Sequence, residues 1–228
     1  MKIGILCATE GELLPLVQAM EAAQKTTYLM RDFYEGTLDG VPVTAVIGGI
    51  GKVNAAITAQ SLILCYGAEL LLFTGIAGGL DDRLAIGDVV IGDQVAHHDL
   101  DMTMMNNDQF PGLPTDWFVP DPRLLALCQG LGTNIHLGRI VSGEVFVTGA
   151  QREDLIQRFH PLCVDMESAA VCQVCWFHKT PVLIIRALSD RADEDAVEVY
   201  FSNKEGSCRS ASEVVRELVR RLAADPTF

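Results

Sequence analysis

Apolar runs typical of buried strands alternate with helical apolar patterns along the whole chain. Buried strands are predicted over residues 2–8, 69–74, 89–96, 140–147, 162–167 and 182–190. Helices are predicted after Thr9, from about Ala169, and over residues 53–65, 122–130, 151–159 and 208–222. Residues 33–38 and 41–47 flank Asp39-Gly40, a strong signal for a β-hairpin. The alternation predicts one domain, residues 1–228: an α/β three-layer sandwich whose central mixed, largely parallel β-sheet is flanked by helices.

The strand over residues 182–190 carries a charge inside an apolar run. Arg186 interrupts the run, and Ser189-Asp190 ends it. A buried arginine needs a partner because an unpaired charge in the interior is costly. A carboxylate at the end of such a strand lies where open α/β sheets place their ligands. The same residues, taken alone, are equally compatible with an edge strand, a solvated arginine and an ordinary polar turn.

Two glycine-rich segments follow predicted strands. Residues 48–52 lead into a helix, but Val53 stands where a Walker loop needs Ser or Thr, and Asn54 replaces the third glycine of a dinucleotide fingerprint. What remains is a tight turn with backbone N–H groups near a helix start. Residues 75–79 predict a second turn, at which the backbone comes close to another group.

Composition narrows the class of protein. Of the 228 residues, 49% are apolar and 21% are charged, which is typical of a soluble globular protein. The net charge of −13 disfavours nucleic acid and an anionic membrane surface as partners. The apolar run at the N-terminus is too short for a secretory signal, and Glu69 with several glycines interrupts apolar residues 61–80. A cytoplasmic location is therefore expected, with no nucleic acid and no membrane as partner.

The cysteines and histidines do not form a metal-binding pattern. The seven cysteines are irregularly spaced, and Cys172 and Cys175 form the only Cys-x-x-Cys pair, inside a helical pattern where core packing is expected. His97 and His98 are adjacent, so on a strand they face opposite ways and cannot share one ion. No metal and no cofactor is predicted.

Acidic residues gather at the predicted strand ends, with Arg186 as the only base embedded in a strand. The acids are Glu12, Asp99, Asp101, Asp165, Glu167 and Asp190. Several carboxylates with one arginine suit a positively charged transition state, such as that of glycosidic bond cleavage, in which one acid protonates the leaving group and another activates water. A phosphorolytic enzyme would need basic residues or a group of N–H donors to hold its anion, and the acids near Glu12 favour water instead.

A series of short segments along nearly the whole chain matches a known family in the right order. They include Gly49-Ile-Gly-Lys-Val, Thr74-Gly-Ile-Ala-Gly-Gly-Leu, His98-Asp-Leu-Asp, Gln109-Phe-Pro-Gly, Ile140-Val-Ser-Gly-Glu-Val-Phe, Val164-Asp-Met-Glu-Ser-Ala and Arg186-Ala-Leu-Ser-Asp-Arg-Ala-Asp. In these segments the chain resembles the 5′-methylthioadenosine/S-adenosylhomocysteine nucleosidases of the purine nucleoside phosphorylase superfamily. The resemblance implies the α/β fold already expected and an N-glycosyl hydrolase that releases adenine without a cofactor.

The resemblance also implies catalytic roles for three residues. Asp190 matches the acid that protonates the leaving adenine, for which a raised pKa is expected because the acid must be protonated when the bond breaks. Glu12 matches the residue that orients and deprotonates the attacking water. Arg186 matches a residue that helps to position this water, and Glu12 with the water is expected to be its partner.

Further matches define the expected substrate site. Glu167 matches the carboxylate that binds the ribose hydroxyls, with Met166 against the sugar. Phe146 matches the aromatic side chain that packs on the purine, and the backbone of Val147 matches the group that reads its edge. The remaining expected site residues are Ser189 and Ile76 near the acid, and Ile50, Met102, Met105 and Tyr200 in an apolar pocket for the 5′-substituent. The family also implies a homodimer whose partner chain helps to close this pocket.

The chain departs from the family pattern at several positions. Ile76 replaces a serine that lies close to the catalytic acid, Asp165 replaces a glutamate, and Thr9 replaces an apolar residue. These departures are compatible with a divergent second type of nucleosidase. The expected substrates are 5′-methylthioadenosine and S-adenosylhomocysteine, with 5′-deoxyadenosine as a further candidate. The alternatives are a hydrolase of another purine nucleoside such as futalosine, a nucleoside phosphorylase, and a binding protein that has lost catalysis; the complete set of acids and Arg186 disfavours the last.

Overall fold

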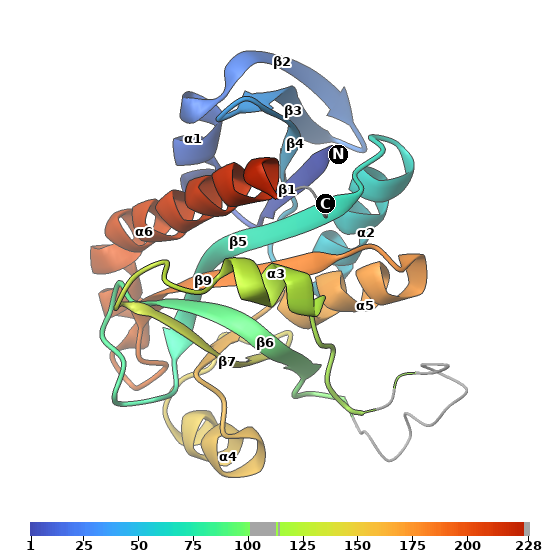
Figure 1. Cartoon of the computed structure of the whole chain (residues 1–228). Helices are drawn as coiled ribbons and strands as arrows, with labels where there is room; N and C mark the ends of the chain where they lie inside the picture. The colour runs from blue at the N-terminus through green and yellow to red at the C-terminus, as the bar shows by residue number, and fades with distance from the viewer. Residues whose placement is uncertain (101–112, 114, 226–228) are drawn as a thin grey trace.

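Strands and helices alternate along the chain as the hydrophobic pattern predicts (Figure 1). The computed structural model describes residues 1–100, 113 and 115–225. Its strands are β1 (Ile3–Cys7), β2 (Glu21–Tyr28), β3 (Arg31–Leu38), β4 (Val41–Ile47), β5 (Leu70–Gly79), β6 (Val89–His97), β7 (Ile135–Ser142), β8 (Cys163–Asp165) and β9 (Val182–Asp190). Its helices are α1 (Glu10–Ala19), α2 (Lys52–Leu64), α3 (Pro122–Leu127), α4 (Ala150–Phe159), α5 (Ser168–His178) and α6 (Ala196–Ala224).

All the described strands belong to one mixed sheet, in the order β2-β3-β4-β1-β5-β8-β7-β6-β9. β1 pairs in parallel with β4 and β5, and β9 pairs in parallel with β5 and antiparallel with β6. The pairing between β5 and β9 also closes β5, β8, β7, β6 and β9 into a ring. The predicted central mixed sheet is confirmed, and one half of it curls into a small closed unit.

Helices cover both faces of this sheet and complete the three layers. On one face, α1 and α6 pack against β1, β4, β5 and β9, and α3 packs against α6, with Leu16, Val215 and Leu218 almost fully buried. On the other face, α2 and α5 lie side by side, with Ala59 and Cys175 buried in a second apolar cluster. Figure 1 shows α6 crossing the sheet on the first face and α4 at the end away from β2.

The hairpin around Asp39-Gly40 forms as predicted. Asp39 and Gly40 have φ angles of 48° and 81°, the left-handed values that a tight two-residue hairpin turn requires. β3 and β4 pair in register on either side of them. β2 was not expected, because every residue from Glu21 to Tyr28 is exposed and the segment has no apolar alternation. It forms at the sheet edge by backbone pairing with β3 alone.

Three element boundaries differ from the sequence prediction. α6 begins at Ala196 rather than near Cys208, and the added turns contain Ser202, Asn203 and Gly206, which have low helix propensity. Residues 75–79 are not a turn but the end of β5, because β9 and β8 pair with them on both sides. β7 also ends earlier than expected, at Ser142.

The cysteines and histidines occupy the places that the pattern predicts. Cys172 and Cys175 are free and buried in α5, and burial raises the pKa of both thiols. His97 hydrogen-bonds Gln173 at 3.1 Å, whereas His98 lies against Gly143. Within residues 1–100, 113 and 115–225, no cluster of three or more His, Cys, Asp or Glu could hold a metal ion. In the same ranges no helix is both long and apolar enough to cross a membrane.

The early start of α6 leads to a stability prediction. Gly206 lies inside this helix, and a Cβ added there would meet nothing within 4 Å. Gly206→Ala should therefore stabilise the protein by about 0.5–1 kcal/mol, because alanine loses less backbone freedom in a helix. Gly40→Ala is the matched control, since its Cβ also has free space but its φ is 81°. Gly40→Ala should lower the free energy of unfolding measured by urea denaturation. Equal effects of the two substitutions would contradict the conclusion that α6 already includes Gly206.

Candidate active site

A cavity of about 450 Å³ lies at the carboxyl ends of the central strands. This is the edge at which open α/β sheets bind ligands. The lining includes most of the predicted site residues: Glu12, Ile50, Ile76, Phe146, Val147, Met166, Glu167, Ser189, Asp190 and Tyr200. Met102 and Met105 lie outside the described residues. A second cavity, of about 430 Å³ between α5 and residues 118–121, contains none of the predicted site residues.

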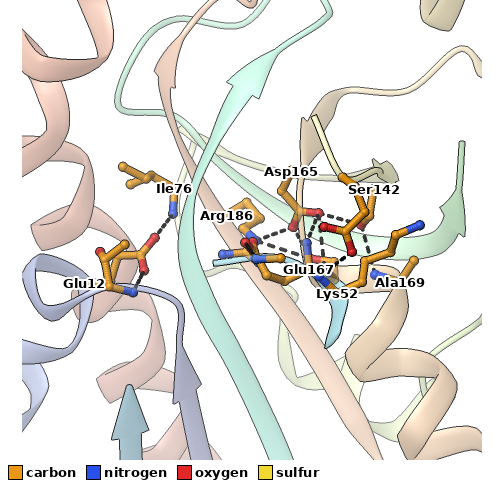
Figure 2. A network of polar contacts seen from close by, with 12 residues as sticks. Glu12, Lys52, Ile76, Ser142, Asp165, Glu167, Ala169 and Arg186 are labelled. Atoms are coloured by element: carbon orange, nitrogen blue, oxygen red, sulfur yellow. Dashed lines mark hydrogen bonds and ion pairs between the residues drawn. The ribbon is translucent and has the colours of Figure 1, made fainter. Parts of the chain in front are cut away.

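Arg186 is fully buried behind this cavity (Figure 2). Its Nε donates to Asp165 Oδ2 at 2.6 Å and to Ser168 Oγ at 3.2 Å. Its Nη2 lies 3.5 Å from Glu167 Oε2, and the guanidinium stacks on Phe73 with 4.0 Å to the ring centroid. The edge-strand alternative is therefore wrong, because β9 is paired on both sides and its arginine has no contact with solvent.

The partner of Arg186 differs from the expected one. Its direct ion pair is with Asp165, whereas Glu12 faces it across the backbone of Gly75. A Cβ on Gly75 would lie 2.3 Å from Arg186 Nη1 and 2.4 Å from Glu12 Oε1. Only glycine leaves room for both groups, which explains this glycine in a central strand. The two terminal nitrogens of Arg186 have no hydrogen-bond acceptor among the described residues.

Asp165 is the most heavily hydrogen-bonded side chain of the site. Its Oδ1 accepts from Ser142 Oγ at 2.5 Å and from the backbone N–H groups of Glu167 and Ser168. Its Oδ2 accepts from Arg186 and from the Ser168 hydroxyl. Sequence reasoning treated Asp165 only as an acid at a strand end and a departure from the family. With its acceptors occupied, it holds other groups in place and is not available to a ligand.

Glu12 is held at the cavity wall by two backbone donors. Its Oε1 accepts from Ile76 N at 3.0 Å, and its Oε2 accepts from Thr9 N at 2.7 Å. The second bond forms because Thr9 is the N-cap of α1 and Glu12 is the third residue of this helix. The carboxylate is only 4% exposed, so its orientation is set before any ligand binds.

Glu167 joins the cavity to the start of α2. It is the N-cap residue of α5, and its Oε1 accepts from Gly51 N at 2.9 Å. Burial raises the pKa of Glu167 to about 7; Arg186 opposes this increase and Asp165 adds to it. The interaction with Gly51 was missed, because nothing in the sequence shows that residues 51 and 167 meet.

Asp190 is buried at the end of β9, and no basic side chain among the described residues pairs with it. Its Oδ1 accepts from Ala192 N and its Oδ2 from Ser189 Oγ, both at 2.8 Å. Burial raises the pKa of this carboxyl above its ordinary value, and these two hydrogen bonds lower it. The raised pKa agrees with the expected direction. Ile76 lines the same cavity, but the strand register pairs it with Ala187 and places Gly78 beside Asp190.

Aromatic and aliphatic side chains form the open side of the cavity. Phe146 and Tyr200 meet edge to face, with ring centroids 6.0 Å apart. Phe146 is 44% exposed and Ile50 is 55% exposed, whereas Val147 is buried. Val197 and Phe201 also line this side and were missed, because the sequence analysis began the last helix after them.

Comparisons with known proteins agree with this geometry. The family model described as "Phosphorylase superfamily" matches residues 2–224. A 5′-methylthioadenosine/S-adenosylhomocysteine nucleosidase from Staphylococcus carnosus is 35% identical, with 96% of this chain and all of the relative covered. The nucleosidase from Streptococcus pneumoniae, solved with a transition-state inhibitor, has a TM-score of 0.91 at 33% identity. The match covers 97% of this chain and 100% of that one. A futalosine hydrolase from Helicobacter pylori has a TM-score of 0.88 at 28% identity, with 96% and 97% covered.

The fold and the carboxylate-lined cavity therefore define an enzyme of the phosphorylase superfamily. The full-length match to relatives above 30% identity narrows this class. The chain belongs to the family of 5′-methylthioadenosine/S-adenosylhomocysteine nucleosidases and is an N-glycosyl hydrolase, as the sequence analysis predicted.

The hydrogen bonding of Asp165 predicts its contribution to stability. Asp165→Asn should destabilise the fold by about 3–5 kcal/mol, because it removes the nearest counter-charge of the buried Arg186. Asp39→Asn is the matched control, since Asp39 pairs with Arg216 at 2.8 Å on the surface. Its effect should stay below about 1 kcal/mol. Urea denaturation at one protein concentration measures the free energy of unfolding of both variants. Similar small decreases in the two variants would show that the buried ion pair is not required for stability.

Proposed function

We propose that the protein hydrolyses the N-glycosidic bond of 5′-methylthioadenosine and S-adenosylhomocysteine and releases adenine. The observation that carries the proposal is the buried Asp190 carboxyl with its raised pKa, in the same cavity as Glu12 and Glu167. A raised pKa helps a carboxyl to hold the proton that a general acid must donate. The nucleosidase relatives named above support the choice of substrate.

The reaction follows from the positions of three carboxyl groups. Asp190 donates its proton to the purine as the bond between the purine and ribose C1′ breaks, and the bonding electrons leave with adenine. Glu167 binds the ribose hydroxyls beside the positive charge that develops on the sugar. A water molecule then forms the new bond to C1′ and loses a proton to Glu12, which gives adenine and the 5-substituted ribose. Met166 lies against the sugar, with Phe146 and the backbone of Val147 at the purine.

Two features support water rather than phosphate as the nucleophile. Two N–H groups at the start of α2 already bind carboxylates: Gly51 N binds Glu167, and Lys52 N binds Glu144 at 2.9 Å. Arg186 is engaged by Asp165 and lies 3.5 Å from Glu167. A phosphate ion entering the site would therefore meet three carboxylates, and the N–H groups of Gly51 and Lys52 and the Nε of Arg186 already have acceptors.

The likeness to futalosine hydrolase supports a second candidate substrate. The two folds match closely, and the ribose and purine parts of the cavity would suit either nucleoside. One difference between these nucleosides is the group on the 5′-carbon, which would lie next to Ile50 and Tyr200. 5′-Deoxyadenosine is a third candidate, because it lacks any large substituent there.

The direct test is incubation of the protein with each nucleoside, with and without phosphate. Release of free adenine and methylthioribose from 5′-methylthioadenosine without phosphate is the expected result. A strict requirement for phosphate would reject hydrolysis. Faster turnover of futalosine than of either thio-substituted nucleoside would reassign the substrate, and tight binding without cleavage would indicate a lost activity.

Substitution of the proposed acid tests the mechanism. Asp190→Asn should abolish turnover of 5′-methylthioadenosine, because the amide cannot give a proton to the leaving purine. Nucleoside affinity should remain within about tenfold, since the acid acts mainly in the transition state. Steady-state kinetics and calorimetric titration measure the two quantities. Substantial turnover in the variant would show that another group is the acid.

We also propose that the protein is a cytoplasmic homodimer whose partner chain covers the open side of the cavity. Four exposed apolar side chains line this cavity, Ile50, Val145, Val197 and Phe201, and the exposed Val53 lies three residues after Ile50 at the start of α2. A contiguous apolar patch of this kind is typical of an interaction surface. Closure by a second chain would exclude water from the 5′-substituent.

The dimer is tested by analytical ultracentrifugation. The expected mass is twice the chain mass of 24.8 kDa. Val53→Asp should shift the protein toward the monomer, because Val53 is 70% exposed beside the cavity and a charge there opposes apolar contact. Leu29→Asp, at the 52% exposed tip between β2 and β3, is the control and should leave the mass unchanged. A monomeric native protein would overturn the proposal.

A further inference from the structure

The turn that follows Asp190 has an unusual backbone conformation. Ala192 has a φ of 50°, in the left-handed region that residues other than glycine rarely adopt. It is 1% exposed, and its N–H donates to Asp190 Oδ1 at 2.8 Å. The strained conformation therefore provides a hydrogen bond to the proposed general acid, and the surrounding structure must hold it there.

The opposite end of the same peptide group is held by α4. Arg152, in the first turn of this helix, donates from Nε to the carbonyl oxygen of Arg191 at 3.0 Å. The Arg191 carbonyl and the Ala192 N–H belong to one planar peptide unit and point in opposite directions. Rotation of this unit would break the bond to Arg152 and the bond to Asp190 together. The two contacts thus define one orientation of the peptide.

Arg152 is itself well fixed. Its Nη2 donates to Asp82 Oδ1 at 2.5 Å, its Nη1 donates to Glu153 Oε1 at 3.1 Å, and its side chain is only 12% exposed. α4 is anchored below the site by Leu155, which packs in one apolar cluster with Val147 and Ala192. The packing of α4 therefore fixes the position from which Arg152 holds the turn after Asp190.

We propose that Arg152 is a positioning residue for the reaction, acting on Asp190 through the peptide between Arg191 and Ala192. The inference rests on the proposed function, because it assumes that Asp190 is the acid. The role is conformational, since the guanidinium contacts the carbonyl and not the carboxyl group.

The role predicts a specific change in pH dependence. Around Asp190, burial and Asp193 raise the carboxyl pKa, whereas the Ala192 N–H and the Ser189 hydroxyl lower it; the β5 neighbour, Gly78, carries no charge. Loss of the Ala192 hydrogen bond should therefore raise the Asp190 pKa. Since the acid must be protonated, turnover falls as pH rises through this pKa. Without Arg152 the alkaline limb of kcat should move to higher pH.

The experiment compares Arg152→Met, Arg152→Lys and Arg158→Met with the native protein, using 5′-methylthioadenosine. Arg152→Met should lower kcat by roughly ten- to a hundredfold, because a misplaced acid is inefficient, and should change KM by less than about threefold. Arg152→Lys keeps a donor for the carbonyl and should recover part of kcat and of the pH profile. Arg158 is the matched control on α4, half exposed and paired with Asp154 at 2.9 Å. Its variant should behave as the native protein.

Several outcomes would overturn the positioning role. The role is rejected if Arg152→Met has the same kcat and the same pH dependence of kcat as Arg158→Met. Equal losses in the Met and Lys variants, with a lower Tm and an unmoved alkaline limb, would assign Arg152 to stability alone. A crystal structure of Arg152→Met with the Ala192 N–H still on Asp190 would reject the role without reference to activity. Native protein that releases no adenine would instead reject the proposed function, and with it the role of Asp190.

Discussion

The buried ion pair between Arg186 and Asp165 is the interaction on which the site depends. Both side chains are almost completely removed from water, which is costly unless every charged atom finds a partner. Asp165 also accepts hydrogen bonds from two serine hydroxyls and two backbone N–H groups, which compensate for its burial. These donors come from β7, the start of α5 and the segment after β8, while Arg186 comes from β9. The pair therefore connects segments far apart in the sequence at one end of the sheet.

The same pair determines the electrostatics of the cavity. Asp165 uses the Nε of Arg186, so the terminal nitrogens remain directed toward Glu167 on one side and toward Glu12 across Gly75 on the other. One cation is thus shared among three carboxylates. A site with this excess of negative charge favours a positively charged transition state and disfavours an anionic nucleophile. The arrangement connects the packing of the sheet to the choice of water as the attacking group.

Much of the fold and several residues of the site could be predicted from the local sequence. The predictions that were wrong have physical reasons. The apolar run around Arg186 showed that the arginine had to be paired, but the identity of its partner depends on a register that brings residues 165 and 186 together. The glycines of β5 suggested a turn because glycine has no side chain to pack; here the missing side chains make room for Arg186 and Glu12. The first turns of α6 place Val197, Tyr200 and Phe201 on one helical face toward the cavity, and Val197 and Phe201 are exposed rather than part of the core. Local sequence rules for helices, strands and turns therefore fail most often at residues whose conformation serves a ligand site.

The carboxyl groups of the site have separate roles because their surroundings differ. Glu167 is buried but faces Arg186, which favours its charged form and opposes the effect of burial. Asp190 is buried with no ion pair recorded among residues 1–100, 113 and 115–225, and the neighbouring Asp193 further disfavours its charged form. In the proposed mechanism, the carboxyl with no cation beside it donates the proton to the leaving group, and the carboxyl that faces a cation binds the sugar. The Ala192 N–H lowers the pKa of Asp190 but also orients the carboxyl. In our proposal the orientation of the acid, rather than its proton, therefore depends on the peptide after Arg191, which Arg152 of α4 holds.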